Sequence, residues 1–393
     1  MSQQRTRAEA GSALFDHVCG NTTQQTASVL SIPAEEFVDE GRWKLEIERI
    51  FKKLPLILAW SAELSAPGAY KTLEIMGLPL LISRGADGLV RVFLNSCTHR
   101  GAQLTGQERG NCNRFTCPYH GWTYATDGRL IGVADKAGFG EFNHQERGLR
   151  SLPCVERAGL VFAVLTPDAP LNVEEFYGGM LTEIESFNLQ DWSWCGSREL
   201  PGPNWKIAFD GYIENYHFAT THRTTLAPYF ISGVMTFDTF GPHVRVGAPS
   251  ASILASMGSA PREEWQNYEN NGYEFVRSIF PNVTISVLPE HVVYLTQIFP
   301  GNTPGESITL LSFLRQRPPQ DEEEHRRMTE IMDVTLNILR TEDYSTNFGV
   351  QKSLQSGLLD SVIFGRNEAA NQFFHRCTEY YLQEQPEGPL PVL

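Results

Sequence analysis

The chain has 393 residues, of which 41% are hydrophobic and 20% charged, with a formal net charge of −14 at pH 7. A chain of this length is expected to need more than one simple core, and an acidic balance without a run of lysine and arginine argues against a nucleic-acid partner. Residues 1–20 lack the apolar core of a secretory signal, and no stretch approaches the roughly 18 uninterrupted apolar residues of a spanning helix. We therefore expect a cytoplasmic protein that does not enter a membrane.

The N-terminal part, residues 1–54, is predicted to be a helical segment that belongs to the larger C-terminal domain. Its opening residues, 1–25, are polar and are expected to be loosely ordered. Beyond them Phe37, Trp43, Ile47 and Phe51 recur at helical spacing, which predicts a helix that Pro55 ends.

Short strands joined by tight turns are predicted from about residue 71 to residue 165. The alternation of apolar and polar residues breaks at residues 77–79 and 87–88, and residues 122–132 form a hairpin that turns at Asp127 and Gly128. Residues 159–167 supply a final strand. We expect a small all-β domain over residues 55–168, dense in glycine because its strands are joined by turns.

Residues 169–393 are predicted to mix helices with long strands. Helices are predicted over residues 173–187, 204–222, 321–340, 341–355 and 367–383, and antiparallel strands over residues 244–256, 283–300 and 307–318. The predicted fold class is α+β, with the all-β domain inserted in, or preceding, a domain whose large antiparallel sheet is flanked by helices.

Two cysteine–histidine pairs lie close together in the predicted all-β domain. Cys97 and His99 occur in CTHRGA, and Cys117 and His120 occur in CPYHGW, each pair beside a glycine turn. Zinc accepts two thiolates and two imidazoles, but zinc fingers usually place both cysteines before a helix that carries both histidines. The alternating order on loops favours a two-iron cluster, with both thiolates on one iron and both imidazoles on the other.

The remaining five of the seven cysteines have no histidine at ligand spacing, and Cys112, though close in sequence, matches no ligand position. An odd number of cysteines in a reducing compartment does not indicate a disulfide framework. These five are expected to be small, buried apolar residues.

The two stretches resemble the Rieske cluster-binding motif, Cys-x-His followed by Cys-x₂-His. Respiratory Rieske proteins carry an additional cysteine in each loop, where this chain has Ala102 and Tyr119. The resemblance is therefore to the oxygenase branch. Trp122 is expected to pack over the cluster loop, and imidazole ligation implies a higher reduction potential than four thiolates give.

A second group of metal-ligand types lies in DGYIENYHFATTH, residues 210–222, which supplies Glu214, His217 and His222. On a helix Glu214 and His217 share one face, while His222 belongs to the frayed end or to the loop that follows. Two histidines and one carboxylate can bind a mononuclear iron and leave positions open for dioxygen and substrate.

The chain from about Trp43 to Leu382 resembles the large, catalytic subunit of Rieske non-haem iron ring-hydroxylating oxygenases, whose catalytic domain has a helix-grip, or START-like, fold. The resemblance implies a third iron ligand, an aspartate on a late helix ahead of a glutamine. In TEDYSTNFGVQ this is Asp343, with Asp360 as the rival, and Glu342 is interpreted only as an acid near a helix N-terminus.

The resemblance also implies a homotrimer in which one chain's cluster lies beside the next chain's iron. In relatives a carboxylate three residues before the first histidine bridges the two subunits. Carried over, Glu214 links His217 to His120 of a neighbouring subunit, and Asp210, one turn earlier, is the alternative.

By the same resemblance the protein is a terminal oxygenase that holds a [2Fe–2S] cluster and mononuclear Fe(II), uses O2, and hydroxylates a small aromatic or alicyclic substrate. No G-x-G-x-x-G fingerprint is present, so an NAD(P)H-dependent reductase, with or without a ferredoxin, is expected to be a separate protein. One alternative is an N- or O-demethylating monooxygenase that acts on a methylated amine, a quaternary ammonium or a methoxy compound. More remote alternatives are a non-catalytic electron carrier and a zinc-stabilised binding module.

The substrate pocket is expected between the iron-binding helix and the long sheet. An aromatic wall would suit a ring or, as a cation cage, a quaternary ammonium group. The candidate wall residues are Tyr212, Phe218, Leu226, Tyr229, Phe230, Phe280 and Ile298.

Overall fold

The computed structural model describes residues 4–259, 261, 272–288, 291–384 and 388–392. The chain divides into two compact units. The first contains the chain up to Glu46, residues 177–180 and the chain from Cys195 onward, and the second contains residues 47–176 and 181–194. The predicted N-terminal segment is thus divided: the chain up to Glu46 lies in the same unit as the C-terminal half, and residues 47–54 lie in the second unit.

The second unit consists of short strands and a few helical turns. Its elements are η2 (Ile47–Phe51), β2 (Leu56–Trp60), η3 (Ser61–Leu64), β3 (Ala69–Ile75), β4 (Leu78–Arg84), β5 (Val90–Leu94), β6 (Arg109–Asn111), β7 (Arg114–Thr116), β8 (Thr123–Ala125), β9 (Leu130–Gly132), η4 (Lys136–Phe139), η5 (His144–Arg147), β10 (Ser151–Leu152), β11 (Cys154–Arg157), β12 (Leu160–Ala163) and η6 (Leu189–Asp191). Helices α3 (Val173–Tyr177) and α4 (Gly179–Glu185) lie where the chain passes between the units.

Three antiparallel sheets form this unit, a five-stranded sheet in the order β10-β5-β4-β3-β6 and two three-stranded sheets, β11-β12-β2 and β7-β8-β9. The β3–β4 hairpin turns at Met76 and Gly77, both at positive φ, as a two-residue hairpin turn requires. Cys97 and Cys117 are both 2% exposed and belong to a core cluster with Phe93, Trp122 and Tyr124. The loops that carry the cysteine–histidine pairs are thus anchored in the core.

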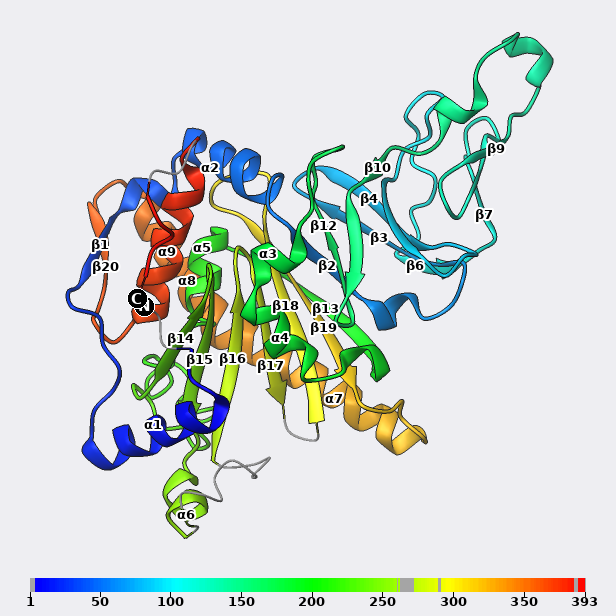
Figure 1. Ribbon diagram of the computed structural model, residues 1–393. Helices are drawn as coiled ribbons and strands as arrows, with labels where there is room; N and C mark the ends of the chain where they lie inside the picture. Colours follow the sequence, from blue (N-terminus) through cyan, green and yellow to red (C-terminus); the bar gives the residue numbers. More distant parts are fainter. Residues whose placement is uncertain (1–3, 260, 262–271, 289–290, 385–387, 393) are drawn as a thin grey trace. The chain divides into compact units, whose positions relative to one another are not determined.

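The first unit is built on a seven-stranded antiparallel sheet in the order β13-β19-β18-β17-β16-β15-β14. Figure 1 shows these strands side by side, with α7 crossing behind them. The elements of this unit are α1 (Arg7–Gly20), β1 (Leu30–Pro33), η1 (Ala34–Phe37), α2 (Glu40–Glu46), β13 (Ser193–Gly202), α5 (Trp205–Asp210), β14 (Thr236–Phe240), β15 (His243–Pro249), α6 (Ile253–Gly258), β16 (Tyr273–Ile279), β17 (Val283–Leu288), β18 (Val292–Pro300), β19 (Ser307–Arg315), α7 (Glu322–Ile338), η9 (Leu339–Tyr344), α8 (Ser345–Gln355), β20 (Ser361–Phe364) and α9 (Ala369–Leu382).

Apolar side chains attach the helices to this sheet. Met328 and Met332 of α7 pack against Leu311 and Phe313 of β19, as the amphipathic pattern of the helix requires. The predicted α+β class, an all-β domain together with a large antiparallel sheet flanked by helices, is confirmed.

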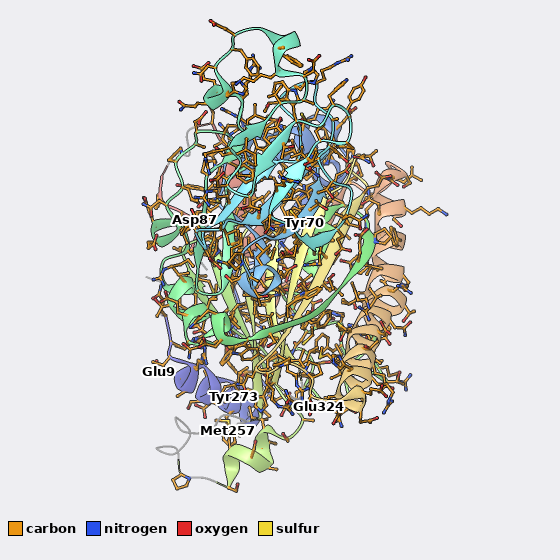
Figure 2. All side chains as sticks on the ribbon, turned by 90° about the vertical axis from the view of Figure 1, so that its right-hand side faces the viewer. Glu9, Tyr70, Asp87, Met257, Tyr273 and Glu324 are labelled. Carbon is orange, nitrogen blue, oxygen red and sulfur yellow. The ribbon has the colours of Figure 1, made fainter. Side chains whose placement is uncertain are left out.

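The prediction that the opening residues are loosely ordered is wrong for residues 7–20, which form α1. The Thr6 side chain accepts a hydrogen bond from the Glu9 N–H, and the Glu9 carboxylate accepts one from the Thr6 N–H, which is a complete capping box. Leu14 then packs against α6 in a cluster that includes Met257 and Tyr273, both labelled near α1 in Figure 2. The polar composition of residues 7–20 did not indicate a helix, because this helix needs only a narrow apolar stripe.

Several predicted elements are interrupted. The helix predicted before Pro55 is divided into η1, α2 and a π-helical turn, η2, and the helix predicted over residues 173–187 breaks at Gly178, where φ is +47°. The strand predicted over residues 244–256 ends at Pro249, and residues 283–300 form two strands, with Pro289 and Glu290 outside the described residues. Strands β13, β14 and β16 were not predicted, because tertiary pairing in the sheet sets their conformation.

The helix predicted over residues 204–222 ends at Asp210, and this correction bears on function. The Glu214 carboxylate accepts hydrogen bonds from the backbone N–H groups of Tyr216 and His217, and the buried Asn215 side chain donates to the carbonyls of Ile231 and Val234. Such side-chain hydrogen bonds compete with helix formation. Residues 211–229 consequently form a series of turns rather than a helix.

Within the described residues, no helix combines the length and the apolar character that a membrane crossing requires.

Candidate metal centres

The loops after Cys97 and Cys117 have the same backbone hydrogen-bond pattern. The Cys97 N–H donates to the Ala102 carbonyl at 2.8 Å, and the Cys117 N–H donates to the Trp122 carbonyl at 2.7 Å. In each loop the glycine four residues on has positive φ and donates its N–H back to the cysteine carbonyl. Two equivalent tight loops therefore each present one thiol and one imidazole.

The two histidines of these loops lie against each other, with ring centroids 4.7 Å apart. His99 also stacks on Trp122 at 5.0 Å, which agrees with the predicted packing of that tryptophan over the loop. The Nδ1 atoms of His99 and His120 are buried and have no hydrogen-bond partner in the structure. Buried polar atoms without partners are costly, so two of them beside two buried thiols fit a metal cluster held by all four side chains.

A hydroxyl group lies against one of the sulfur atoms. The Tyr124 hydroxyl is 3.2 Å from Cys97 Sγ and accepts a hydrogen bond from the Thr98 N–H at 3.0 Å. Burial and the contact with Cys97 raise the pKa of Tyr124 to about 12, so its proton is retained. Against a thiolate the hydroxyl acts as the donor, and donors to ligand sulfurs tune the potential of iron–sulfur clusters.

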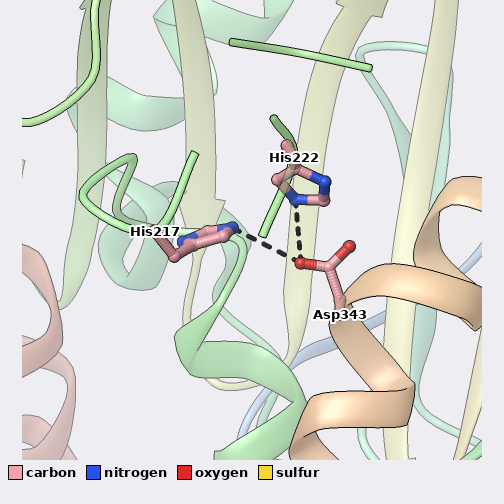
Figure 3. Close-up of side chains that lie close together, drawn as sticks. All are labelled: His217, His222 and Asp343. Atoms are coloured by element: carbon pink, nitrogen blue, oxygen red, sulfur yellow. Dashed lines mark hydrogen bonds and ion pairs between the residues drawn. The ribbon is translucent and has the colours of Figure 1, made fainter. Parts of the chain in front are cut away.

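The second centre is formed by His217, His222 and Asp343, whose ligand atoms all lie within 4.8 Å of one another. Asp343 Oδ1 is 3.1 Å from His222 Nε2 and 3.4 Å from His217 Nε2, as the dashed lines in Figure 3 show. The two histidines come from the turns after α5, and Asp343 comes from η9, one turn of π-helix between α7 and α8. Single π-helical turns occur frequently at functional sites.

A carboxylate contacts the Nδ1 atom of each histidine of this triad. His217 Nδ1 contacts Glu214 Oε1, and His222 donates from Nδ1 to Glu342 Oε2 at 2.6 Å. The Thr225 hydroxyl also donates to Glu342 at 2.6 Å. The interpretation of Glu342 as only an acid near a helix N-terminus is therefore wrong. Nothing in the sequence pairs Glu342 with His222, because 120 residues separate them.

The carboxylates make this centre favourable for positive charge. Burial lowers the pKa of His217, but the neighbouring carboxylates of Asp343 and Glu214 outweigh burial and raise the pKa to about 9. The pKa of Asp343 is lowered because both histidines outweigh its burial. His217 Nε2 and Asp343 Oδ2 are buried without a hydrogen-bond partner. Two imidazole nitrogens and a carboxylate oxygen that converge in this way fit the two-histidine, one-carboxylate site of non-haem iron oxygenases.

The rival residues lie elsewhere. Asp360 is exposed and does not belong to the triad. Asp210, the alternative to Glu214, lies at the end of α5 and accepts hydrogen bonds from Asn371 and His375 rather than from His217. Gln351 is the glutamine that, by the family resemblance, follows the aspartate ligand in the sequence. It accepts a hydrogen bond from the Asn204 N–H at 2.9 Å, which connects α8 to the start of α5.

A cavity of about 280 Å³ opens beside the triad on the side of Glu214. The described residues of its walls include His217 and four carboxylates, one of which is Asp343, and none of them is a lysine or an arginine. The lining residues are Phe37, Ile207, Asp210, Gly211, Glu214, His217, Thr221, Asp343, Thr346, Asn347, Val350, Leu354, Val362, Ile363, Phe364, Glu368 and Asn371.

None of the seven predicted wall residues lines this cavity. Phe218 lies beside the triad, with its ring 5.0 Å from that of His217, and the Tyr212 hydroxyl is 3.4 Å from that of Tyr344. Leu226 and Phe230 are half-buried, and Tyr229 is 67% exposed, which does not fit an enclosing wall. Phe280 packs against Phe374 and Tyr381, and Ile298 is fully buried.

Comparison with known proteins matches both parts of the chain. Residues 55–151 match the Rieske [2Fe-2S] domain, and residues 187–384 match the ring hydroxylating alpha subunit (catalytic domain). The chain is 31% identical over 197 residues to the glycine betaine monooxygenase oxygenase subunit of Pseudomonas aeruginosa, covering 50% of this chain and 46% of that protein. It is 31% identical over 254 residues to the chlorobenzene dioxygenase subunit alpha of Cupriavidus sp., covering 59% and 51%.

The chain spans about half the length of these curated relatives. Among solved structures, the quaternary ammonium Rieske monooxygenase CntA superposes with a TM-score of 0.78 at 21% identity, covering 97% of this chain and 99% of that one. At that identity the likeness establishes the fold.

Proposed function

The chain belongs to the ring-hydroxylating alpha-subunit family and carries a Rieske domain, and from this membership we propose that it is the terminal oxygenase of a multicomponent system. It would use O2 and electrons from NAD(P)H, delivered by a separate reductase, to hydroxylate a small organic substrate. The observation that carries this proposal is the convergence of His217, His222 and Asp343 in a chain that also has the two cluster loops. An electron carrier needs only the loops.

The loops would hold the cluster through Cys97 and Cys117 on one iron and His99 and His120 on the other. Bound there, the cluster stores one electron at a time. The protein's own contribution is to keep both sulfurs out of water and to place the Tyr124 hydroxyl on Cys97.

The triad would hold Fe(II), which supplies open positions for O2 beside the substrate. Glu214 and Glu342 fix the orientation of the imidazoles, because each holds the Nδ1 side of its ring and leaves Nε2 directed at the common point. A displacement of about 1 Å in such a ligand can cost about 100-fold in rate.

For the substrate we favour a small cationic methylated amine. Among the residues that the structure describes, the lining of the cavity has four carboxylates and no lysine or arginine, along with apolar side chains such as Phe364 and Val362 that suit methyl groups. The names of the glycine betaine and quaternary ammonium relatives support this class. Hydroxylation of an aromatic ring remains the second candidate, favoured by the chlorobenzene dioxygenase relative.

The test is a substrate panel with a surrogate reductase, read by product mass. A methylated amine is expected to lose CH₂ and release formaldehyde, because hydroxylation of an N-methyl carbon gives a carbinolamine that breaks down. A gain of two oxygens on an aromatic substrate, with no turnover of amines, would replace the favoured class by the second candidate. Turnover of no substrate by protein with about three irons per chain would contradict the oxygenase proposal.

We also propose the subunit arrangement implied by the resemblance, a homotrimer in which Glu214 of one chain approaches His120 of the next. Co-expression of Cys117→Ser chains with His217→Ala chains tests it. Electron transfer between subunits predicts partial activity in the mixed oligomer, because an intact cluster then lies beside an intact iron site. Activity no higher than that of either variant alone would contradict the arrangement.

A further inference from the structure

A histidine–aspartate pair lies behind the cavity beside the triad. His375 of α9 is 3% exposed, and its Nε2 is 3.1 Å from each carboxylate oxygen of Asp210 at the end of α5. Asp210 lines the cavity, together with His217 and Asp343. Asp210 therefore links the buried side chain of His375 to the cavity beside the triad.

Aromatic rings enclose the histidine on its other sides. The ring of His375 lies 4.8 Å from Phe364, 5.1 Å from Phe374 and 5.7 Å from Phe37. The charged group that faces it from η1 is Glu36, whose side chain is 20% exposed and is paired with Arg42 at 3.0 Å. Burial raises the pKa of Glu36 although Arg42, Lys206 and His375 act to lower it.

On the cavity side, the groups that face Asp210 are also acidic. Glu214 and Glu368 both line the cavity, and burial together with the charges of Glu214 and Asp210 raises the pKa of Glu368. Asp210 thus lies between buried His375 and a group of carboxylates that line the cavity.

A structural role alone does not account for the histidine. The Asn371 side chain already donates to the Asp210 carbonyl at 3.0 Å and to its carboxylate at 3.1 Å, which holds the end of α5. A second, ionisable donor adds the capacity to exchange a proton, and histidine is the side chain that does so near neutral pH.

The proposed reaction needs protons at the triad. Hydroxylation of R–H by O2 with two electrons consumes two protons and gives R–OH and H2O. The triad histidines are not free to supply them, because Nε2 would bind iron and Nδ1 is held by Glu214 or Glu342.

We propose that His375 and Asp210 form a proton relay that supplies the cavity beside the triad, an inference that rests on the proposed function. Protonated His375 transfers its Nε2 proton to the Asp210 carboxylate, which leaves a neutral imidazole with its proton on Nδ1, and the resulting carboxylic acid releases the proton into the cavity. Transfer in the reverse direction, from water in the cavity through Asp210, returns a proton to Nε2, so the pair delivers one proton in a turnover and ends the cycle as it began.

The test compares Asp210→Asn and His375→Gln with the wild-type full-length enzyme. Both variants keep a polar side chain of similar size but cannot relay, so kcat should fall by about 10²-fold, as loss of a general acid–base group does. His375→Gln should change KM less than twofold, whereas Asp210→Asn should also raise KM for a cationic substrate, because Asp210 lines the cavity. The solvent deuterium isotope effect on kcat should rise, and Asp210→Glu should restore part of kcat. Iron content and melting temperature check that each variant is folded and loaded.

Glu368→Gln is the matched control, because it removes a carboxylate from the same cavity without touching His375. It should raise KM for a cationic substrate and leave the isotope effect as in the wild type. An Asp210→Asn variant that behaves like Glu368→Gln would overturn the relay and leave Asp210 as a binding charge.

A readout independent of activity comes from ¹⁵N-histidine NMR of the full chain with Zn²⁺ at the mononuclear site, with His375→Gln to assign the resonance. Asp210→Asn should change the ¹⁵N chemical shifts of the His375 ring, because it removes the carboxylate that lies 3.1 Å from Nε2. Unchanged shifts, or wild-type kcat in both variants, would overturn the relay. If the wild-type enzyme turns over no substrate while this coupling is seen, the proposed function fails and the relay fails with it.

Discussion

The two candidate metal centres are built in opposite ways. The cluster loops lie within 24 consecutive residues, and each loop closes on itself through the same pair of backbone hydrogen bonds. The triad joins His217 and His222 to Asp343, which lies 121 residues beyond His222, and none of the three lies in a regular α-helix or strand. One centre is therefore determined by local turns, and the other by how distant segments pack.

This difference determines which neighbouring residues support each metal centre. Around the cluster loops the support is local, since the glycine turns and the core residues Trp122 and Tyr124 follow within the same stretch of chain. Around the triad the support comes from Glu342 and Gln351, whose partners lie 120 and 147 residues away in sequence. Changes at the triad should thus affect metal affinity through packing, and changes at the loops should affect the cluster directly.

The largest expected effect is loss of the cluster in Cys117→Ser. A buried thiolate ligand is replaced by a hydroxyl that binds iron weakly, so the visible absorption and the EPR signal of the reduced cluster should disappear. Cys112→Ser is the control, since Cys112 lies nearby but outside both ligand pairs, and it should keep both spectra. A Cys117→Ser protein that keeps its colour would contradict the assignment of Cys117 as a ligand of the cluster.

Next in size is loss of the mononuclear iron in Asp343→Ala. Two imidazoles remain and should not retain Fe(II), so iron should fall from about three to about two atoms per chain while the cluster spectrum persists. Asp360→Ala should keep about three, because Asp360 is exposed and apart from the triad. Simultaneous loss of the cluster signal would show that the two centres are not independent.

A smaller effect is expected from Glu342→Gln, which weakens the support of His222 without removing a ligand. Changes in residues that orient metal ligands typically cost about 10–100-fold in metal affinity. Competition with a chelator measures the affinity. Glu330→Gln, at an exposed acid of α7 paired with Arg326, should leave it unchanged. Equal affinities in both variants would mean that the distant carboxylate does not stabilise the triad.

The smallest effect is expected from Tyr124→Phe, which removes the hydroxyl beside Cys97 Sγ and leaves the ring in the core. Loss of one hydrogen bond of about 0.5–1.5 kcal/mol to the more negative, reduced state should lower the one-electron potential by about 20–65 mV. Redox titration followed by EPR measures it. Tyr70→Phe, whose ring packs on Phe115 in the same core, should shift the potential much less. A larger shift in Tyr70→Phe would assign the effect to packing.

Much of the fold and of the candidate site could be predicted from local patterns. Turn residues and alternation indicated the all-β domain, and the family resemblance named the three residues that the structure brings together as a triad. The cavity wall was not predicted, because aromatic residues near the histidines in sequence, such as exposed Tyr229, do not line the cavity. Among the described residues that line the cavity, Glu214, His217 and Asp343 were predicted as site residues, and Asp210 was predicted as the alternative to Glu214.

The sequence by itself determined the two cysteine–histidine loops, because their conformation is set by hydrogen bonds and glycines a few residues apart. Only the tertiary structure decided that Glu342 holds His222 and that His375 faces Asp210, because these contacts depend on how α5, η9 and α9 pack together. It also decided that residues 211–222 leave the helix, since the carbonyls of Ile231 and Val234, 16 and 19 residues beyond Asn215, hold that side chain and outweigh a local preference worth less than about 1 kcal/mol per residue.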